Sequence, residues 1–165
     1  MSVQDIIDHL SQYPCKLVEI TGGEPLCQTG TPFLITQLIK KGYTVLLETN
    51  GSKDIRIVDS RCIKIVDIKC PGSGESQNND LDNLNRLTAN DQLKFVITDK
   101  QDYDYAKKII HSSWADSYPV PILFSAAHPA LEPEILAEWM LADNLAVRLQ
   151  VQLHKILWPN EDKGR

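Results

Sequence analysis

Short apolar runs alternate with helix-patterned segments along the whole of this 165-residue chain. Six runs rich in β-branched and other apolar residues predict strands, at 16–21, 43–47, 63–67, 93–97, 120–124 and 147–153. Apolar residues at helical spacing predict helices at 2–10, 31–41, 102–112 and 133–142. Because strands that alternate with helices favour a parallel sheet with right-handed crossovers, we expect an α/β fold and a single domain over residues 1–165.

The composition narrows the range of partners. The net charge is −5 and the 17 Lys and Arg residues are scattered, so we expect no direct nucleic-acid partner. No apolar run approaches the roughly 20 residues of a membrane span, and the first ten residues do not resemble a signal peptide, which predicts a cytoplasmic protein without a membrane partner. The spacing of Cys15, Cys27, Cys62 and Cys70 fits neither metal knuckles nor a disulfide framework, so we expect mostly reduced, buried thiols.

Polar and glycine residues follow most of the predicted strands. In parallel α/β sheets ligands gather beyond the carboxyl ends of the strands, so these residues are the first candidates for a site. Gly22 and Gly23 permit close backbone approach to a ligand, and the carboxylate of Glu24 can accept hydrogen bonds from an ammonium group. The long polar segment 71–90 has no strong periodicity and is interpreted as a loop with a short helix near its end.

Each candidate also has a purely structural interpretation. The two glycines can form a tight turn with Glu24 in solvent, and Asp67 with Lys69 can be an ordinary pair at the end of a strand. His154 can be a surface imidazole. Glu48 and Asn50 can serve turn chemistry alone, because Asn-Gly favours a positive φ.

Thr21-Gly22-Gly23-Glu24-Pro25 resembles the segment by which radical S-adenosylmethionine (SAM) enzymes hold the methionine ammonium group. Further segments resemble, more narrowly, the 7-carboxy-7-deazaguanine synthases of queuosine biosynthesis: 67–75, 94–97 with 102–103, 136–139 and 148–155. This resemblance covers nearly the whole chain and implies a partial (β/α) barrel of the radical SAM type.

The resemblance also implies roles for individual residues. Thr21 and His154 would contact a pterin substrate. The SAM site would be formed by Gly22, Gly23, Glu24, Asp67, Ile68, Lys69, Ser125, Ala126, Ala127 and His128, with Pro25, Glu48 and Asn50 as further members. The implied reaction converts 6-carboxy-5,6,7,8-tetrahydropterin to 7-carboxy-7-deazaguanine through a radical derived from SAM, with loss of ammonia.

Radical SAM enzymes also carry three cysteines that bind a [4Fe–4S] cluster, and this chain has no such triplet. The resemblance implies that the first strand, the cluster loop and a residue that helps to bind Mg²⁺ would precede Met1. We therefore expect an inactive chain when it is alone, and self-association, for instance as a homodimer, through an uncovered strand edge. Two alternatives remain open: a non-catalytic SAM- or pterin-binding remnant, and another radical SAM enzyme such as an activating enzyme.

Overall fold

The computed structural model describes residues 1–114 and 119–158. One six-stranded sheet organises them, and its strands are β1 (Leu17–Ile20), β2 (Thr44–Thr49), β3 (Ile63–Ile68), β4 (Gln92–Ile97), β5 (Ile122–Ala126) and β6 (Arg148–Gln150). All neighbouring pairs are parallel, and the strands lie side by side in chain order. In the described part of the chain the sheet is open, with β1 and β6 at its edges, as expected for a partial (β/α) barrel.

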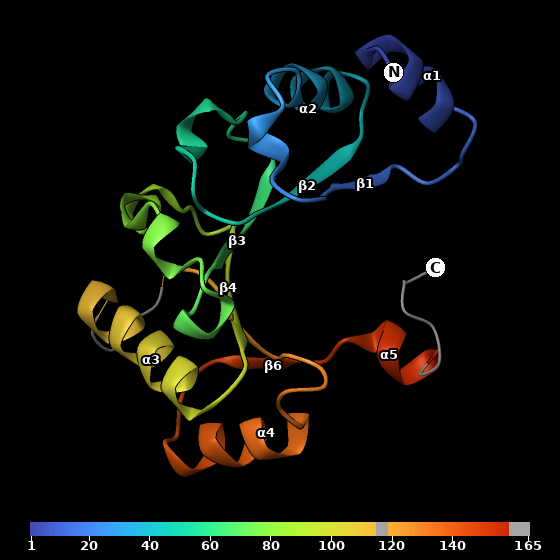
Figure 1. Cartoon of the computed structure of the whole chain (residues 1–165). Helices are drawn as coiled ribbons and strands as arrows, with labels where there is room; N and C mark the ends of the chain where they lie inside the picture. The colour runs from blue at the N-terminus through green and yellow to red at the C-terminus, as the bar shows by residue number, and fades with distance from the viewer. Residues whose placement is uncertain (115–118, 159–165) are drawn as a thin grey trace.

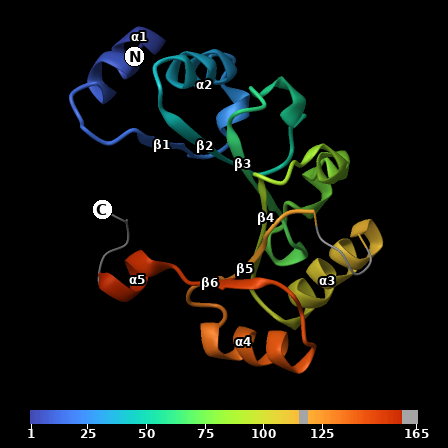
Figure 2. The ribbon, with the colours of Figure 1, turned by 180° about the vertical axis from the view of Figure 1, so that it is seen from behind.

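The helices are α1 (Val3–Leu10), α2 (Thr31–Lys40), α3 (Lys100–Trp114), α4 (Pro133–Ala142) and α5 (Leu153–Leu157). α1 begins with a capping box, because Ser2 Oγ accepts from Asp5 N at 3.1 Å and Asp5 Oδ2 accepts from Ser2 N at 2.8 Å. Figures 1 and 2 show α2, α3 and α4 on the outer side of the curved sheet, whereas α5 follows β6 on the inner side. No described helix is both long and apolar enough to cross a membrane.

The core lies between the sheet and the outer helices. Val45, Leu47, Val66 and Phe95 alternate along their strands with residues of the inner face, and all four are buried in one apolar cluster. Ile35 and Leu38 of α2 and Tyr103 and Ile110 of α3 complete this cluster from the helix side. The outer face of the sheet therefore carries most of the apolar stabilisation, and the inner face is left for polar side chains.

The segment between β3 and β4 has more local structure than a plain loop. It forms 3₁₀ turns at Pro71–Ser73, Ser76–Asn78 and Leu81–Arg86, and the last of these is the short helix that the sequence predicted. Asp102 at the start of α3 accepts hydrogen bonds from Gly72 N at 2.8 Å and Thr98 N at 3.0 Å. A Cβ at position 72 would collide with the Thr98 hydroxyl and the Asp102 carboxylate, so this contact requires glycine.

Two strand predictions need correction. The predicted strand at 120–124 lies at 122–126, directly after Pro121, because proline has no N–H to donate to a ladder. The predicted strand at 147–153 is wrong beyond Gln150, since residues 153–157 form α5. Residues 147–153 alternate as in a strand, but Leu153, Ile156 and Leu157 also have the spacing of a helix. The apolar pattern therefore allows both structures at this point.

Candidate functional site

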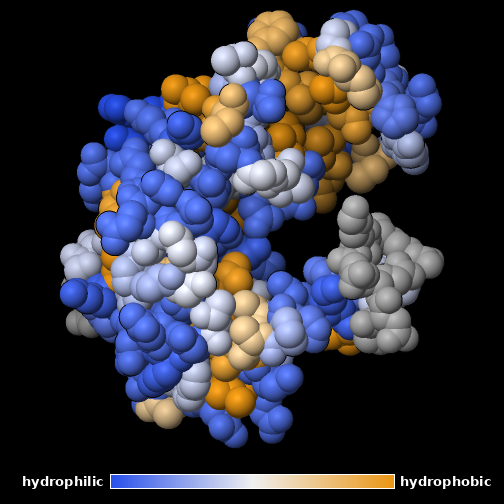
Figure 3. Space-filling model, viewed as in Figure 1, coloured by the Kyte–Doolittle hydropathy of each residue, from blue (hydrophilic) through white to orange (hydrophobic). Residues whose placement is uncertain are grey.

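A row of polar side chains crosses the inner face of the sheet. Glu48, Asp67, Lys94 and Ser125 lie on neighbouring strands at positions that alternate with core residues, and the register pairs Asp67 with Lys94 and Ser125 with Gln150. Figure 3 shows a hollow on this side of the molecule, bordered largely by hydrophilic residues. The inner face is therefore a concave polar surface at the carboxyl ends of parallel strands.

The charged side chains of this row are paired with one another. Lys94 Nζ lies 2.6 Å from Glu48 Oε1, and Lys69 Nζ lies 2.7 Å from Asp67 Oδ2. Since Asp67 and Lys94 are register partners, the ammonium group of Lys94 also acts on the carboxylate of Asp67. Two carboxylates, on β2 and β3, are thus paired with two ammonium groups, one on β4 and one just after β3, and the four charges balance.

Asp67 is the least satisfied member of the row. Its Oδ1 is buried and has no hydrogen-bond partner within the described residues, although its other oxygen is bound to Lys69. Burial raises the pKa of Asp67, and this effect outweighs the opposing influence of Lys69 and Lys94, while Glu48 raises the pKa further. A buried acceptor without a donor costs free energy, so Oδ1 is a ready partner for a donor on a ligand.

The loop after β1 is tied to the end of β2 through Glu24. The Glu24 carboxylate accepts from Asn50 N at 2.7 Å, from Leu26 N at 2.9 Å and from Thr49 Oγ1 at 2.9 Å. These three donors leave about one of the four acceptor positions of a carboxylate open. Glu24 is thus not a solvated side chain, and it fixes the loop while keeping limited capacity for an ammonium donor.

The other residues of this loop differ in exposure. Thr21, Gly22 and Gly23 are exposed, and Pro25 is buried at the start of the 3₁₀ turn Pro25–Cys27 that Glu24 caps. Gly22 has φ of 140°, a region that other residues rarely adopt, and open space surrounds a Cβ built at Gly22 or Gly23. The glycines therefore give a ligand access to the backbone of this loop. Asn50 does serve turn chemistry, since its Oδ1 accepts from Ser52 N at 3.0 Å.

The carboxyl end of β5 and the start of α5 form two neighbouring cavities. One, of about 330 Å³, is lined by Ser125 and His154 together with Lys94, Val96, Gln150, Val151, Gln152 and Leu153. The other, of about 240 Å³, is lined by Ala126 and His128 together with Leu131, Glu132, Pro133, Val151, Gln152, Lys155 and Ile156. Ser125 and His154, which are 29 positions apart, therefore share one cavity with Lys94 of the charged row.

Two candidates do not present a side chain to this surface. Ile68 is fully buried in the core cluster, and Ala127 contributes its backbone, whose N–H donates to Ile97 O at 2.9 Å. Three residues of the site were not singled out from the sequence: Lys94, Thr49 and Gln150. Lys94 had a detectable signal, because a lysine stands in a largely apolar strand and its charge is opposite to that of Asp67 on the adjacent strand and of Glu48 one strand further.

The described residues include no group of three or more His, Cys, Asp or Glu that is able to hold a metal ion. The four cysteines are free; Cys62 and Cys70 are buried as expected, but Cys15 and Cys27 are exposed. Burial raises the pKa of the Cys62 thiol to about 12 and also raises that of Cys70, so both stay protonated. An iron–sulfur cluster therefore does not fit the residues that the structure describes.

An open parallel α/β sheet with a polar, charge-balanced inner face is the arrangement in which α/β proteins bind small molecules beyond the ends of their strands. No family model matches the chain. It is 41% identical to the 7-carboxy-7-deazaguanine synthase of Koribacter versatilis, over 92% of this chain and 73% of that protein. The same enzyme of Chlorobaculum tepidum is 38% identical, over 99% and 76%, and that of Methanospirillum hungatei is 36% identical, over 95% and 65%. The chain belongs to the 7-carboxy-7-deazaguanine synthase family.

Proposed function

We propose that this chain binds SAM on the inner face of its sheet and forms the SAM- and pterin-binding part of a 7-carboxy-7-deazaguanine synthase. The observation that carries the proposal is the buried, unpartnered Oδ1 of Asp67 beside Lys69, at the centre of a polar face. Family membership supports the reaction, which converts 6-carboxy-5,6,7,8-tetrahydropterin to 7-carboxy-7-deazaguanine with loss of ammonia.

In this proposal the chain positions its ligands. The exposed Gly22–Gly23 backbone and the remaining acceptor position of Glu24 receive the methionyl ammonium group. Oδ1 of Asp67 accepts a hydrogen bond from a hydroxyl or amino donor of SAM. Thr21 follows the edge strand β1 and His154 comes after the edge strand β6, so they contact the pterin from opposite edges of the sheet. SAM supplies the radical chemistry, and because the described residues do not fit a cluster, no step through a cluster or through Mg²⁺ is assigned to them.

Calorimetric titration of the purified chain with SAM tests this assignment. The wild-type chain is expected to bind SAM, and Asp67→Asn is expected to bind about tenfold more weakly, because a charge-assisted hydrogen bond becomes a neutral one. Asp104→Asn changes an exposed carboxylate on α3 and serves as the matched control with unchanged affinity. Absence of SAM binding to the wild-type chain would refute the proposal.

The lack of a metal-binding group among the described residues favours a second candidate, a binding module without catalysis. Both candidates predict SAM binding, so affinity does not separate them. The two candidates are separated by formation of 5′-deoxyadenosine from SAM when the chain is reconstituted anaerobically with iron, sulfide and a polypeptide that supplies the cluster cysteines. The enzyme candidate requires this product, and the binding-module candidate forbids it.

A further inference from the structure

We infer that two asparagines of the segment between β3 and β4, Asn79 and Asn83, are positioning residues for the ligand site. We call this pair the amide clamp. It deepens the proposed function and rests on it, because the loops that the clamp holds carry the residues assigned to SAM. Neither asparagine belongs to the inner face itself, so each acts through the backbone of other residues.

Asn79 holds the backbone of Lys69 from both sides. Its Oδ1 accepts from Lys69 N at 2.9 Å and its Nδ2 donates to Lys69 O at 2.9 Å. A side-chain amide has the same donor and acceptor as a peptide, so Asn79 pairs with Lys69 as a neighbouring strand would. This pairing begins one residue beyond the end of β3 and fixes Lys69 where its ammonium group reaches Asp67.

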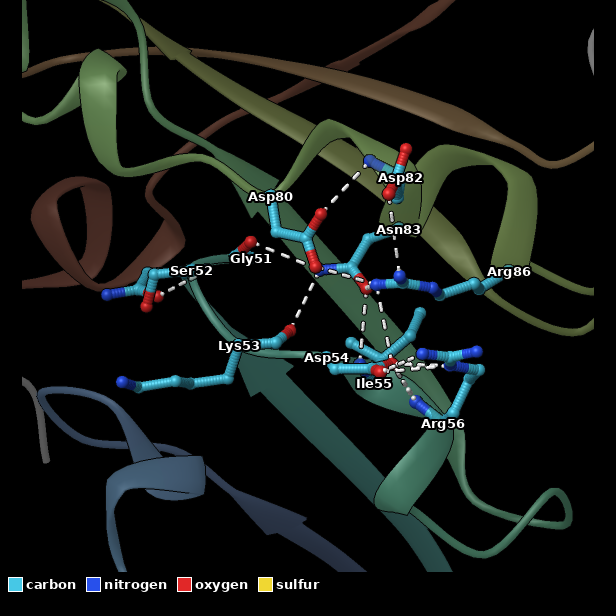
Figure 4. Close-up of polar contacts among 11 residues, drawn as sticks. Gly51, Ser52, Lys53, Asp54, Ile55, Arg56, Asp80, Asp82, Asn83 and Arg86 are labelled. Carbon is cyan, nitrogen blue, oxygen red and sulfur yellow. Dashed lines mark hydrogen bonds and ion pairs between the residues drawn. The ribbon is translucent and has the colours of Figure 1, made fainter.

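Asn83 holds the end of β2 in a similar way. It is fully buried, its Nδ2 donates to Gly51 O at 3.1 Å and to Lys53 O at 2.8 Å, and its Oδ1 accepts from Ile55 N at 3.2 Å. Figure 4 shows these contacts converging on the loop after β2. Thr49 at the end of β2 and Asn50 at the start of this loop both donate to Glu24.

Two further groups connect and support the clamp. Asp80 N donates to Gly51 O at 2.9 Å, between the two asparagines in the chain. Arg86 Nη1 lies 2.6 Å from Asp80 Oδ2 and 2.8 Å from Asn83 Oδ1, and Figure 4 shows its side chain reaching across the segment. One short segment thus fixes the ends of β2 and β3 together, which sets the separation between the Glu24 and Asp67 parts of the proposed SAM site.

Replacement of Asn79 by aspartate tests the clamp at a half-buried position. The introduced carboxyl group still accepts from Lys69 N, but when ionised it cannot donate to the carbonyls of Lys69 and Ser76 that it faces. Protonation restores one donor, and the two carbonyl oxygens that face the carboxyl group favour its protonated form and so raise its pKa. SAM affinity, measured calorimetrically with the full chain, is therefore expected to fall about tenfold relative to wild type at pH 7.5 and to recover as the pH is lowered towards 5.

Two comparison variants make this result specific. Asn78→Asp changes the adjacent amide, whose Nδ2 donates to Glu75 Oε2 at 2.6 Å, and is expected to keep wild-type affinity at both pH values. Asn79→Ala has no carboxyl to protonate and is expected to stay weak at both. The titratable and charged groups around the clamp include the Tyr105 hydroxyl, 3.5 Å from Asn79 Nδ2, the Lys69–Asp67 pair and the Arg86–Asp80 pair, and all are common to every variant.

Circular dichroism at the titration temperature must show each variant folded, so that affinity is that of the native protein. If wild type binds SAM and Asn79→Asp binds equally well at pH 7.5, or if its weakness does not depend on pH, the clamp has only a structural role and the inference is refuted. If wild type itself does not bind SAM, the proposed function fails first and the inference fails with it.

Discussion

Replacing Asp91 by alanine removes a carboxylate on which four donor groups of Lys64 and Thr88 converge. Asp91 is fully buried; its Oδ1 accepts from Lys64 N at 2.8 Å and lies 3.1 Å from Lys64 Nζ, and its Oδ2 accepts from Thr88 N at 2.8 Å and Thr88 Oγ1 at 2.9 Å. The change leaves a buried ammonium without its counter-ion, together with two unpaired backbone N–H groups. Breaking a buried pair in this way costs about 4 kcal/mol.

The reverse deletion is expected to be milder. In Lys64→Met the chain loses the ammonium group, whose other contact is Cys62 O at 3.2 Å, while the Asp91 carboxylate keeps three donors. We expect a cost of about 2 kcal/mol for this variant, because the loss is that of one hydrogen bond to a charged group.

Urea unfolding followed by circular dichroism gives both values. A loss of about 4 kcal/mol in the free energy of unfolding also lowers the melting temperature of a chain of this length by roughly 10 °C. Thermal unfolding that starts at low temperature therefore gives a second measurement for Asp91→Ala. Equal losses for the two variants, or a larger loss for Lys64→Met, would contradict the view that Asp91 stabilises the fold through its backbone donors as much as through its charge.

Two further outcomes follow from other parts of the sheet. Burial raises the pKa of Asp67 above its ordinary value of 3.8, so ionised Asp67 costs folding free energy at pH 7 and costs none below pH 3.8. Asp67→Asn is therefore expected to exceed wild type in urea stability at pH 7 and to lose that advantage as the pH falls towards 3.8; an equal difference at both pH values would contradict this reasoning. Self-association through the edge strand β1 predicts a mass above 18.6 kDa by light scattering, and Leu17→Lys, at a side chain that is 57% exposed, is expected to reduce it.

The fold was largely predictable because its local signals agree. The capping box at Ser2, Pro133 at the start of α4 and the β-branched runs of β1 to β4 each point to the element that forms. The predicted last strand is longer than β6, because residues 147–153 alternate apolar and polar side chains while Leu153, Ile156 and Leu157 also match a helix. At an exposed edge strand little burial distinguishes the two patterns.

The candidate functional site on the inner face was predictable only in part. Motif resemblance marked Glu24, Asp67 and His154 because glycine turns and polar residues at strand ends stand out in a sequence. Lys94 and Asn83 were not assigned roles because their importance depends on contacts with residues 46 and 32 positions away. Local patterns do not specify such pairings, and the register of the sheet and the path of the 71–90 segment supply them.

Core residues and inner-face residues alternate along each strand, so that different side chains pack the interior and line the cavity. Many binding sites use the same side chains for both. Phe95 and Phe124 face the helices and hold the sheet together, while their chain neighbours Lys94 and Ser125 face the cavity. Substitutions at inner-face positions therefore change the chemistry offered to a ligand without altering the packed interior. The polar character of the inner face is thus open to change one strand at a time, because the apolar packing of the sheet lies on its other face.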